Sequence, residues 1–411
     1  MKKIFLSVLL LPLMLSGCKE QEPVELLPVA VPSVVEQTTQ KPTEAAAAVT
    51  TTQATPANED EISPKIKRRL KKMNLQEKIC QMFIATPEKS SYYDSLTYVD
   101  DWFRTCYAEY PIGGFIYFNA NISYDQQLRD LLSQSQQMAL DYNGIGLFQS
   151  VDEEGGTITR VQSSLWTPPA VEDMSYYGKL NDYNTTYEAG RTIGGYIADY
   201  GFNLNFAPVA DVYISETNEL GNRIFSSDPL VVSDMCTAMI QGLKSHKIAA
   251  TLKHFPGLGA GTGNTHYTTV EIDRTLEQLE IAEFPAFKGG IEAGADFVMV
   301  GHQIVSAAGD NLPADLSPVV VTDWLREKMN FEGIIISDSQ AMGAITSTYT
   351  SDEAAIKSIE AGVDIILMPN DLRAAIDGVE AAVKSGDLTK ERIDESVIRI
   401  LEKKNEMGLL D

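Results

Sequence analysis

The chain has 411 residues, a formal net charge of −24 at pH 7, and 44% hydrophobic residues. Its length fits one large domain or two average ones, and its composition is typical of a soluble globular protein. The excess of acidic residues argues against a nucleic-acid-binding protein, because phosphate backbones attract clustered Lys and Arg. We therefore expect no nucleic-acid partner.

The first residues have the pattern of an export signal. Two lysines precede an apolar run over residues 4–15, and small residues follow it. The run is too short to cross a bilayer comfortably, which disfavours a transmembrane helix. Residues 15–18, LSGC, resemble the lipobox of bacterial lipoproteins; an ordinary secretory signal is the alternative. We predict a signal over residues 1–18 with lipidation at Cys18, and hence an exported, membrane-anchored protein at the cell envelope, on the outer face of the cytoplasmic membrane or at the outer membrane.

The composition changes over residues 19–62 to Pro, Thr, Ala, Gln, Glu and Val, with no aromatic residue and no glycine. Such a segment buries too little apolar surface to offset chain entropy, so we predict a disordered linker. Order should begin at Ser63, as a helix N-cap, with Pro64 in the first helical position. The basic residues that follow, up to residue 72, predict a solvated helix face. Docking of this face on an anionic lipid or polymer is the alternative.

Farther along the chain, short apolar or β-branched runs alternate with helical patterns, which indicates βα units and a parallel sheet. The eight runs cover residues 82–85, 114–118, 147–152, 205–211, 249–254, 297–302, 334–338 and 365–368. The helices expected with them cover residues 123–142, 183–200, 233–246, 276–293, 318–329, 352–361, 371–385 and 390–404. We predict an α/β fold, a single-domain (β/α)₈ TIM-type barrel over residues 63–411. A doubly wound open sheet has the same periodicity and is the alternative.

Polar side chains lie at the ends of most of these runs. They are Asp152, Asp211, Lys253 with His254, His302, and Ser337 with Asp338. Barrel enzymes gather their active sites at the C-terminal ends of the strands, so this layout predicts an active site there. For Asp211 and His302 the plainer interpretation is a hydrogen bond at the barrel rim. The chain has four histidines, and two of them, His254 and His266, flank one glycine-rich loop.

Four ordered motifs over about residues 74–410 resemble glycoside hydrolase family 3, specifically its bacterial β-N-acetylglucosaminidases. They are VDEEGG at residues 151–156 with Arg160, GNR-I-FSSDP at 221–229, KHFPGLG at 253–259 with His266, and ISDSQAM at 336–342. Each motif alone is weak, but their order and spacing together are specific. Some members of the family add a second α/β domain, and this chain resembles the single-domain kind.

The resemblance implies a role for each matching residue. Asp338 would be the nucleophile of a retaining glycosidase, and His266 the proton donor. The residues that would bind the sugar through its hydroxyl groups are Asp152, Arg160, Arg223, Lys253 and His254. A helix N-cap is the structural alternative for Asp338, and a satisfied structural histidine is the alternative for His266. No cofactor is implied, and no cluster has the spacing of metal ligands.

Two residues depart from the pattern of the family. The family has an aspartate two residues before the loop histidine, where it orients the imidazole and stabilises its positive charge, and this chain has Asn264 there as catalytic support. Leu258 replaces the second histidine of the family's KHFPGHG. An asparagine does not neutralise an imidazolium, and the corresponding change in a Ser-His-Asp triad lowers turnover by roughly 10⁴-fold. General acid–base catalysis typically supplies about 10²–10⁴-fold, so this change would slow an enzyme without removing its site.

The resemblance implies a retaining exo-glycosidase that removes terminal β-linked N-acetylglucosamine, or a related β-sugar, from peptidoglycan fragments or oligosaccharides. A catalytically weak or inactive carbohydrate-binding barrel is the alternative, because of Asn264. A transport-type solute-binding lipoprotein shares the signal and the linker but not the repeated βα units. Besides Cys18, three cysteines remain, at positions 80, 106 and 236. We expect buried free thiols, and a bond between Cys80 and Cys106 stays an open alternative.

Overall fold

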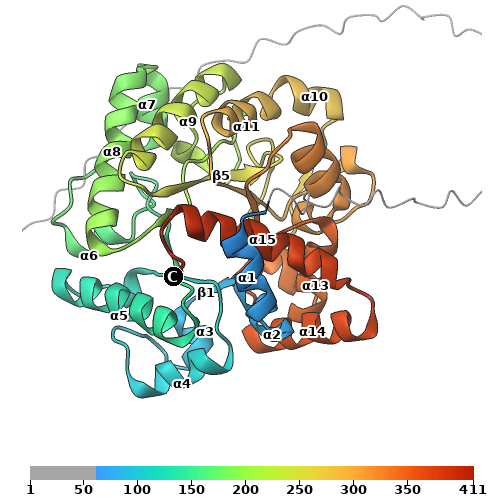
Figure 1. Cartoon of the computed structure of the whole chain (residues 1–411). Helices are drawn as coiled ribbons and strands as arrows, with labels where there is room; N and C mark the ends of the chain where they lie inside the picture. Colours follow the sequence, from blue (N-terminus) through green and yellow to red (C-terminus); the bar gives the residue numbers. More distant parts are fainter. Residues whose placement is uncertain (1–61) are drawn as a thin grey trace, which may run out of the picture. The chain divides into compact units, whose positions relative to one another are not determined.

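The computed structural model describes residues 62–411, and Figure 1 labels some of its helices and strands. The signal expected at residues 1–18, with Cys18, lies outside the described residues, as does the expected linker apart from Ile62. Helix α1 (Pro64–Lys72) begins where we predicted, because the Ser63 hydroxyl accepts a hydrogen bond from the backbone nitrogen of Ile66 at 3.3 Å. Over residues 62–411, no helix is both long and apolar enough to cross a membrane.

Eight parallel strands close into a barrel, which confirms the predicted fold and makes the open-sheet alternative wrong. The strands are β1 (Phe83–Ala85), β2 (Gly114–Ile116), β3 (Phe148–Val151), β4 (Leu204–Asn205), β5 (Ala249–Phe255), β7 (Phe297–Val300), β9 (Ile334–Ser339) and β10 (Ile365–Leu367). They follow one another around the barrel in sequence order, and β10 closes it against β1. A closed barrel has no pair of hinged lobes, so the solute-binding alternative is also wrong for residues 62–411.

Strand β9 shows why such runs form a barrel. Its three isoleucines, Ile334 to Ile336, are all buried, as expected where a parallel sheet is covered on both faces. The strand pairs in register with β7, so that Ser337 lies opposite Val300. Beyond Ser337 the strand becomes half-buried, and this places Asp338 at the C-terminal rim.

Helices surround the strands on the outside (Figure 1). The longer ones are α5 (Asp125–Asn143), α8 (Tyr183–Tyr200), α9 (Pro229–Lys244), α11 (Glu283–Glu292), the π-helix η5 (Val319–Lys328), α13 (Ser351–Ala361), α14 (Leu372–Ser385) and α15 (Lys390–Glu406). The shorter ones are α2 (Leu75–Gln81), α3 (Pro87–Ser91), α4 (Asp101–Glu109), α6 (Val161–Leu165), α7 (Met174–Leu180), α10 (Leu276–Ile281) and α12 (Gly343–Thr346). Most of the longer helices match the predicted ranges closely.

Two predicted helices differ from the structure for identifiable reasons. The helix expected over residues 276–293 is broken into α10 and α11, because Pro285 cannot donate to the carbonyl of Ile281 and its ring crowds that carbonyl. Helix α9 begins four residues earlier than expected, at Pro229. There the Asp228 carboxylate caps it by accepting a hydrogen bond from the backbone nitrogen of Leu230 at 2.9 Å.

The strand expected over residues 205–211 is also shorter than predicted, since β4 ends at Asn205. Pro208 has no N–H to donate to a strand ladder. Beyond it the chain still follows β5, because the backbone nitrogen of Ala210 donates to Lys253 O at 2.7 Å. This irregular continuation brings Asp211 to the same rim as His254.

A separate two-stranded sheet lies outside the barrel. It pairs β6 (Glu271–Ile272) in parallel with β8 (Ile304–Val305). It thereby fastens the far end of the loop after β5 to the segment after β7. We did not predict these strands from the sequence, because each is only two residues long.

The three cysteines of the described region are buried free thiols, as expected, and Cys80 and Cys106 are not bonded to each other. Burial raises the pKa of all three thiols, so they stay protonated at neutral pH.

Candidate active site

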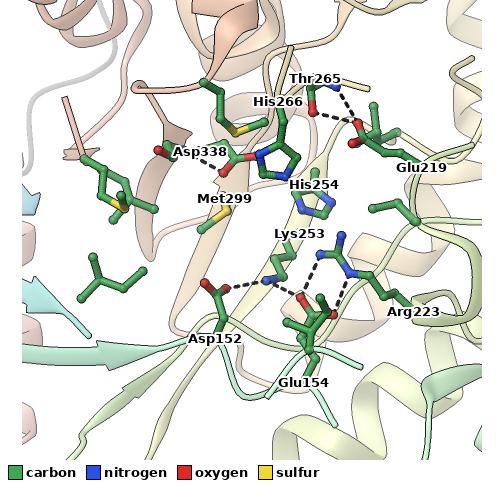
Figure 2. A pocket seen from close by; sticks show the side chains of 18 of the residues that line it. Asp152, Glu154, Glu219, Arg223, Lys253, His254, Thr265, His266, Met299 and Asp338 are labelled. Carbon is green, nitrogen blue, oxygen red and sulfur yellow. Dashed lines mark hydrogen bonds and ion pairs between the residues drawn. The ribbon is translucent and has the colours of Figure 1, made fainter. Parts of the chain in front are cut away.

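A cavity of about 360 Å³ opens at the C-terminal ends of the strands (Figure 2). All seven residues expected to act on the sugar line it, namely Asp152, Arg160, Arg223, Lys253, His254, His266 and Asp338. They come from loops and strand ends that are far apart in the sequence. Asn264 is not among the lining residues. Lys253 and Asp338 therefore share one pocket, as a glycosidase site requires.

Lys253 lies at the centre of an ion-pair cluster. Its ammonium nitrogen is 2.9 Å from Asp152 Oδ1 and 2.6 Å from Glu154 Oε1. Arg223 grips the same Glu154 with two nitrogens, at 2.8 and 2.9 Å. Burial works against ionisation of Glu154, but the two cations outweigh it and hold the pKa of this carboxyl well below its usual range. The cluster fixes two cations and one partly exposed carboxylate, Asp152, in the pocket wall.

Glu154 was not among the residues that we expected in the site. It is buried next to Gly155 and Gly156 and directly follows the buried Glu153. The sequence did contain a signal for Glu154, because two glutamates directly follow Asp152 at the end of a strand. Buried carboxylates need cationic or hydrogen-bonding partners, so one of them could have been expected in the site. The partner, Arg223, was itself a predicted sugar ligand.

Asp211 orients the imidazole of His254. One Asp211 oxygen lies 2.8 Å from His254 Nδ1 and also accepts a hydrogen bond from the backbone nitrogen of His254 at 3.1 Å. The other oxygen accepts from the backbone nitrogen of Leu258 at 2.5 Å. Because Nδ1 faces a carboxylate, it carries a proton, and the Nε2 edge of the ring is left for the pocket. The plainer interpretation of Asp211, a rim hydrogen bond, is confirmed.

Asp338 stands at the end of β9, where its Oδ1 accepts a hydrogen bond from the backbone nitrogen of Ser339 at 2.7 Å. It does not cap the next helix, α12, because the N-cap of that helix is Met342. The N-cap alternative is therefore wrong. Burial disfavours the charged form of Asp338, but the imidazoles of His254 and His302 lower its pKa below the ordinary value. The group is an ionised carboxylate that faces the cavity.

His302 lies behind Asp338 and is fully buried. Its Nδ1 is 2.9 Å from Asp315 Oδ1, and its Nε2 is 2.9 Å from the carbonyl oxygen of Ser339. Both partners are acceptors, so both nitrogens must donate, which only the imidazolium does. Burial opposes the charge, but Asp315 raises the pKa of His302 to about 9. The predicted rim hydrogen bond is confirmed, and it adds a fixed positive charge beside Asp338.

The loop after β5 brings His266 over the pocket, where its side chain is exposed (Figure 2). Asn264 Oδ1 accepts a hydrogen bond from the backbone nitrogen of His266 at 2.9 Å. The asparagine therefore shapes the turn through its oxygen. Leu258, which replaces a histidine of the family pattern, is buried and lines the pocket with its apolar side chain.

Arg160 is held at the pocket wall by its backbone. Its backbone nitrogen donates to the buried carboxylate of Glu153 at 2.6 Å, which also accepts from the backbone nitrogens of Val161 and Gln162. The guanidinium lies 5.4 Å from the ring centre of Phe118. Its Nε is buried without a hydrogen-bond partner in residues 62–411. A buried donor without a partner costs free energy, so the guanidinium is held here by the surrounding packing at some expense of stability.

The chain resembles several proteins of known name. Two β-hexosaminidases are similar in sequence: that of Stenotrophomonas maltophilia (strain K279a) is 32% identical over 260 residues, which are 62% of this chain and 76% of the relative. That of Idiomarina loihiensis is 29% identical over 302 residues, which are 72% of this chain and 88% of the relative.

Several solved structures are also similar to this chain. The glycoside hydrolase family 3 β-N-acetylglucosaminidase from Paenibacillus sp. str. FPU-7 matches with a TM-score of 0.77 at 32% identity, over 82% of this chain and 63% of that one. This chain thus spans just under two thirds of the Paenibacillus enzyme. The β-N-acetylhexosaminidase from Beutenbergia cavernae matches with a TM-score of 0.72 at 26% identity, over 81% of this chain and 99% of that one.

The model of the glycosyl hydrolase family 3 N-terminal domain matches residues 74–403, which is most of the described barrel. This match, the solved structures and the strand-end residues gathered in one pocket agree with the motifs read from the sequence. The chain belongs to glycosyl hydrolase family 3.

Proposed function

We propose that the protein is a retaining β-hexosaminidase that removes terminal β-linked N-acetylglucosamine from peptidoglycan fragments or oligosaccharides. The observation that carries this proposal is the ionised Asp338, which shares one pocket with the Lys253 cluster and with His266. The names of the relatives support the choice of sugar. The cavity of about 360 Å³ is at the small end of the roughly 300–1,000 Å³ range of ligand sites, which suits a single terminal sugar ring.

The mechanism would be a double displacement. A carboxylate oxygen of Asp338 attacks the anomeric carbon while His266 gives a proton to the leaving glycosidic oxygen, so a glycosyl-enzyme forms and the alcohol departs. His266 then takes a proton from water, whose oxygen attacks the anomeric carbon and releases Asp338. Lys253, Arg160 and His254 would hold the hydroxyl groups of the sugar through their pocket-facing nitrogens.

Trapping the glycosyl-enzyme tests this proposal directly. A 2-fluoro glycosyl fluoride of the sugar should label the peptide that contains Asp338, and mass spectrometry of a protease digest reads the label. The Asp338→Ala variant is the control and should stay unlabelled. A wild-type protein that stays unlabelled under conditions that label the Paenibacillus relative would contradict the proposal.

A second candidate function is a carbohydrate-binding barrel with little turnover. One observation favours it. The Asn264 oxygen accepts a hydrogen bond from the backbone of His266, whereas the family has an aspartate here that orients the imidazole. Turnover of an aryl β-glycoside by the wild-type protein separates the two. Turnover comparable to that of the relatives excludes the binding-only candidate, whereas sugar binding without turnover supports it.

We further propose that Cys18 carries a lipid anchor that holds the enzyme at the cell envelope. The support is the lipobox-like LSGC at residues 15–18 after an apolar run. Metabolic labelling with a palmitate analogue should mark the wild-type chain and not the Cys18→Ala variant. Equal labelling of both chains would contradict this assignment.

A further inference from the structure

The loop that carries His266 is fastened to the opposite side of the pocket by a single carboxylate. Glu219, in the segment between β4 and α9, accepts two hydrogen bonds with its Oε1. They come from the backbone nitrogen of Thr265 at 2.9 Å and from the Thr265 hydroxyl at 2.8 Å. Thr265 is only 3% exposed, while its neighbour His266 is exposed to the pocket. Figure 2 shows Glu219, Thr265 and His266 side by side above the cavity.

Two backbone hydrogen bonds hold Thr265 and His266 from the Asp338 side of the pocket. The carbonyl oxygen of His266 accepts a hydrogen bond from the backbone nitrogen of Gly343 at 2.9 Å, and that of Thr265 accepts from Ala344 at 3.2 Å. These donors begin helix α12, shortly after Asp338. A Cβ on residue 343 would lie 2.9 Å from His266 O and 2.6 Å from Tyr267 O, so this close approach requires glycine. Thr265 and His266 thus bridge two rims of the pocket.

Asn264 does not provide this positioning. Its oxygen is used in the local turn with the backbone nitrogen of His266, which sets the shape of the loop but does not tie it to the barrel. Glu219 makes its two bonds as an acceptor from another loop, and hydrogen bonds to an ionised acceptor are roughly twice as strong as neutral ones. Glu219 also lines the pocket itself.

We infer that Glu219 is a positioning residue, which acts through Thr265 to hold His266 over the pocket in the geometry needed to protonate the leaving group. This inference rests on the proposed role of His266 as the general acid. In the family, the aspartate two residues before the loop histidine orients the imidazole and stabilises its positive charge. In this chain the Glu219–Thr265 contact would supply the orientation. Without it, the loop would spend less time closed, and the proton transfer would slow in proportion.

The test compares Glu219→Ala with Glu216→Ala, an exposed glutamate of the same segment that does not line the pocket. Two substrates separate positioning from a general structural effect. A β-linked disaccharide needs a proton on its leaving oxygen, whereas a 2,4-dinitrophenyl glycoside does not. For Glu219→Ala we expect kcat/KM to fall about 10- to 100-fold on the disaccharide and less than about threefold on the dinitrophenyl glycoside. Glu216→Ala should leave both unchanged.

The Thr265 hydroxyl offers an independent variant pair. Thr265→Ala removes one of the two donors to Glu219, whereas Thr265→Ser keeps it. The alanine variant should show the same leaving-group dependence as Glu219→Ala, to a lesser degree, and the serine variant should behave as the wild type. Equal losses of Glu219→Ala on both substrates, or equal behaviour of the two Thr265 variants, would overturn the inference.

Amide hydrogen exchange separates a failure of this inference from a failure of the proposed function. In Glu219→Ala the amides of residues 264–267 should exchange faster than in the wild type and in Glu216→Ala, whether or not the enzyme turns over. Unchanged exchange overturns the Glu219 contact as a positioning device. Faster exchange, together with a His266→Ala variant that shows no leaving-group dependence, keeps the contact but overturns the acid role of His266, and with it the inferred effect on catalysis.

Discussion

Asn264 Oδ1 accepts a hydrogen bond from the backbone nitrogen of His266 at 2.9 Å, in a turn that an aspartate would close equally well. The two residue types differ in what their second polar atom offers. An amide nitrogen is a donor and does not stabilise an imidazolium, whereas a second carboxylate oxygen adds a negative charge beside the loop histidine. The choice between asparagine and aspartate at this position therefore changes the electrostatics of proton transfer and leaves the turn unchanged.

Asn264→Asp should raise kcat on an aryl β-glycoside by about tenfold or more, because the added charge stabilises the protonated form of His266. Affinity for the sugar should not change, since residue 264 does not line the pocket. Steady-state kinetics and competition with free sugar measure the two quantities. An unchanged kcat would mean that this position does not limit the acid–base steps.

Glu154→Gln should strongly destabilise the protein, because the buried side chain is ion-paired with both Lys253 and Arg223. Breaking a buried ion pair at one partner costs about 3–5 kcal/mol. Glu188→Gln is the control, since Glu188 pairs with Arg191 at the surface and should cost less than about 1 kcal/mol. Denaturant unfolding of the three proteins measures the difference. Similar midpoints for the two variants would contradict the assigned role of the cluster.

Predictions from the sequence were most accurate for features that depend on the residues of one strand. Consecutive apolar residues predicted the eight strands, and the polar residues at the ends of most runs predicted the active rim, because strand direction fixes where such a residue lies. The break at Pro285 was missed, because we predicted one helix over residues 276–293, although it follows from one residue type. Contacts between loops could not be predicted from the sequence. Glu219 and Thr265 are 46 positions apart, and neither carries a local signal for the other.

The stability of the barrel should depend on pH through His302. Its folded-state pKa of about 9 lies above the ordinary value of 6.5, so the stabilisation is fully present below about pH 6.5 and is lost as the pH rises through 9. The loss should amount to about 3 kcal/mol. Unfolding free energies of the wild type and of His302→Gln, measured from pH 6 to 10, should differ in slope. The control His246→Gln, at an exposed site, should keep the wild-type slope, and a slope that survives in His302→Gln would contradict this account.

Asp211→Asn should weaken sugar binding through His254. The aspartate accepts three hydrogen bonds with its two oxygens, and the amide group of an asparagine replaces one of those oxygens by a donor. Either the ring of His254 or the backbone nitrogen of Leu258 then loses its acceptor. We expect KM to rise about tenfold, in line with one unsatisfied buried group.

The matched control for this substitution is Asp228→Asn. Asp228 caps α9, and asparagine is as good an N-cap as aspartate, so neither KM nor stability should change. Measuring KM together with the binding of free sugar separates lost affinity from slower chemistry. A fall in kcat at constant KM in Asp211→Asn would show that His254 acts on the reacting centre rather than on the hydroxyl groups of the sugar.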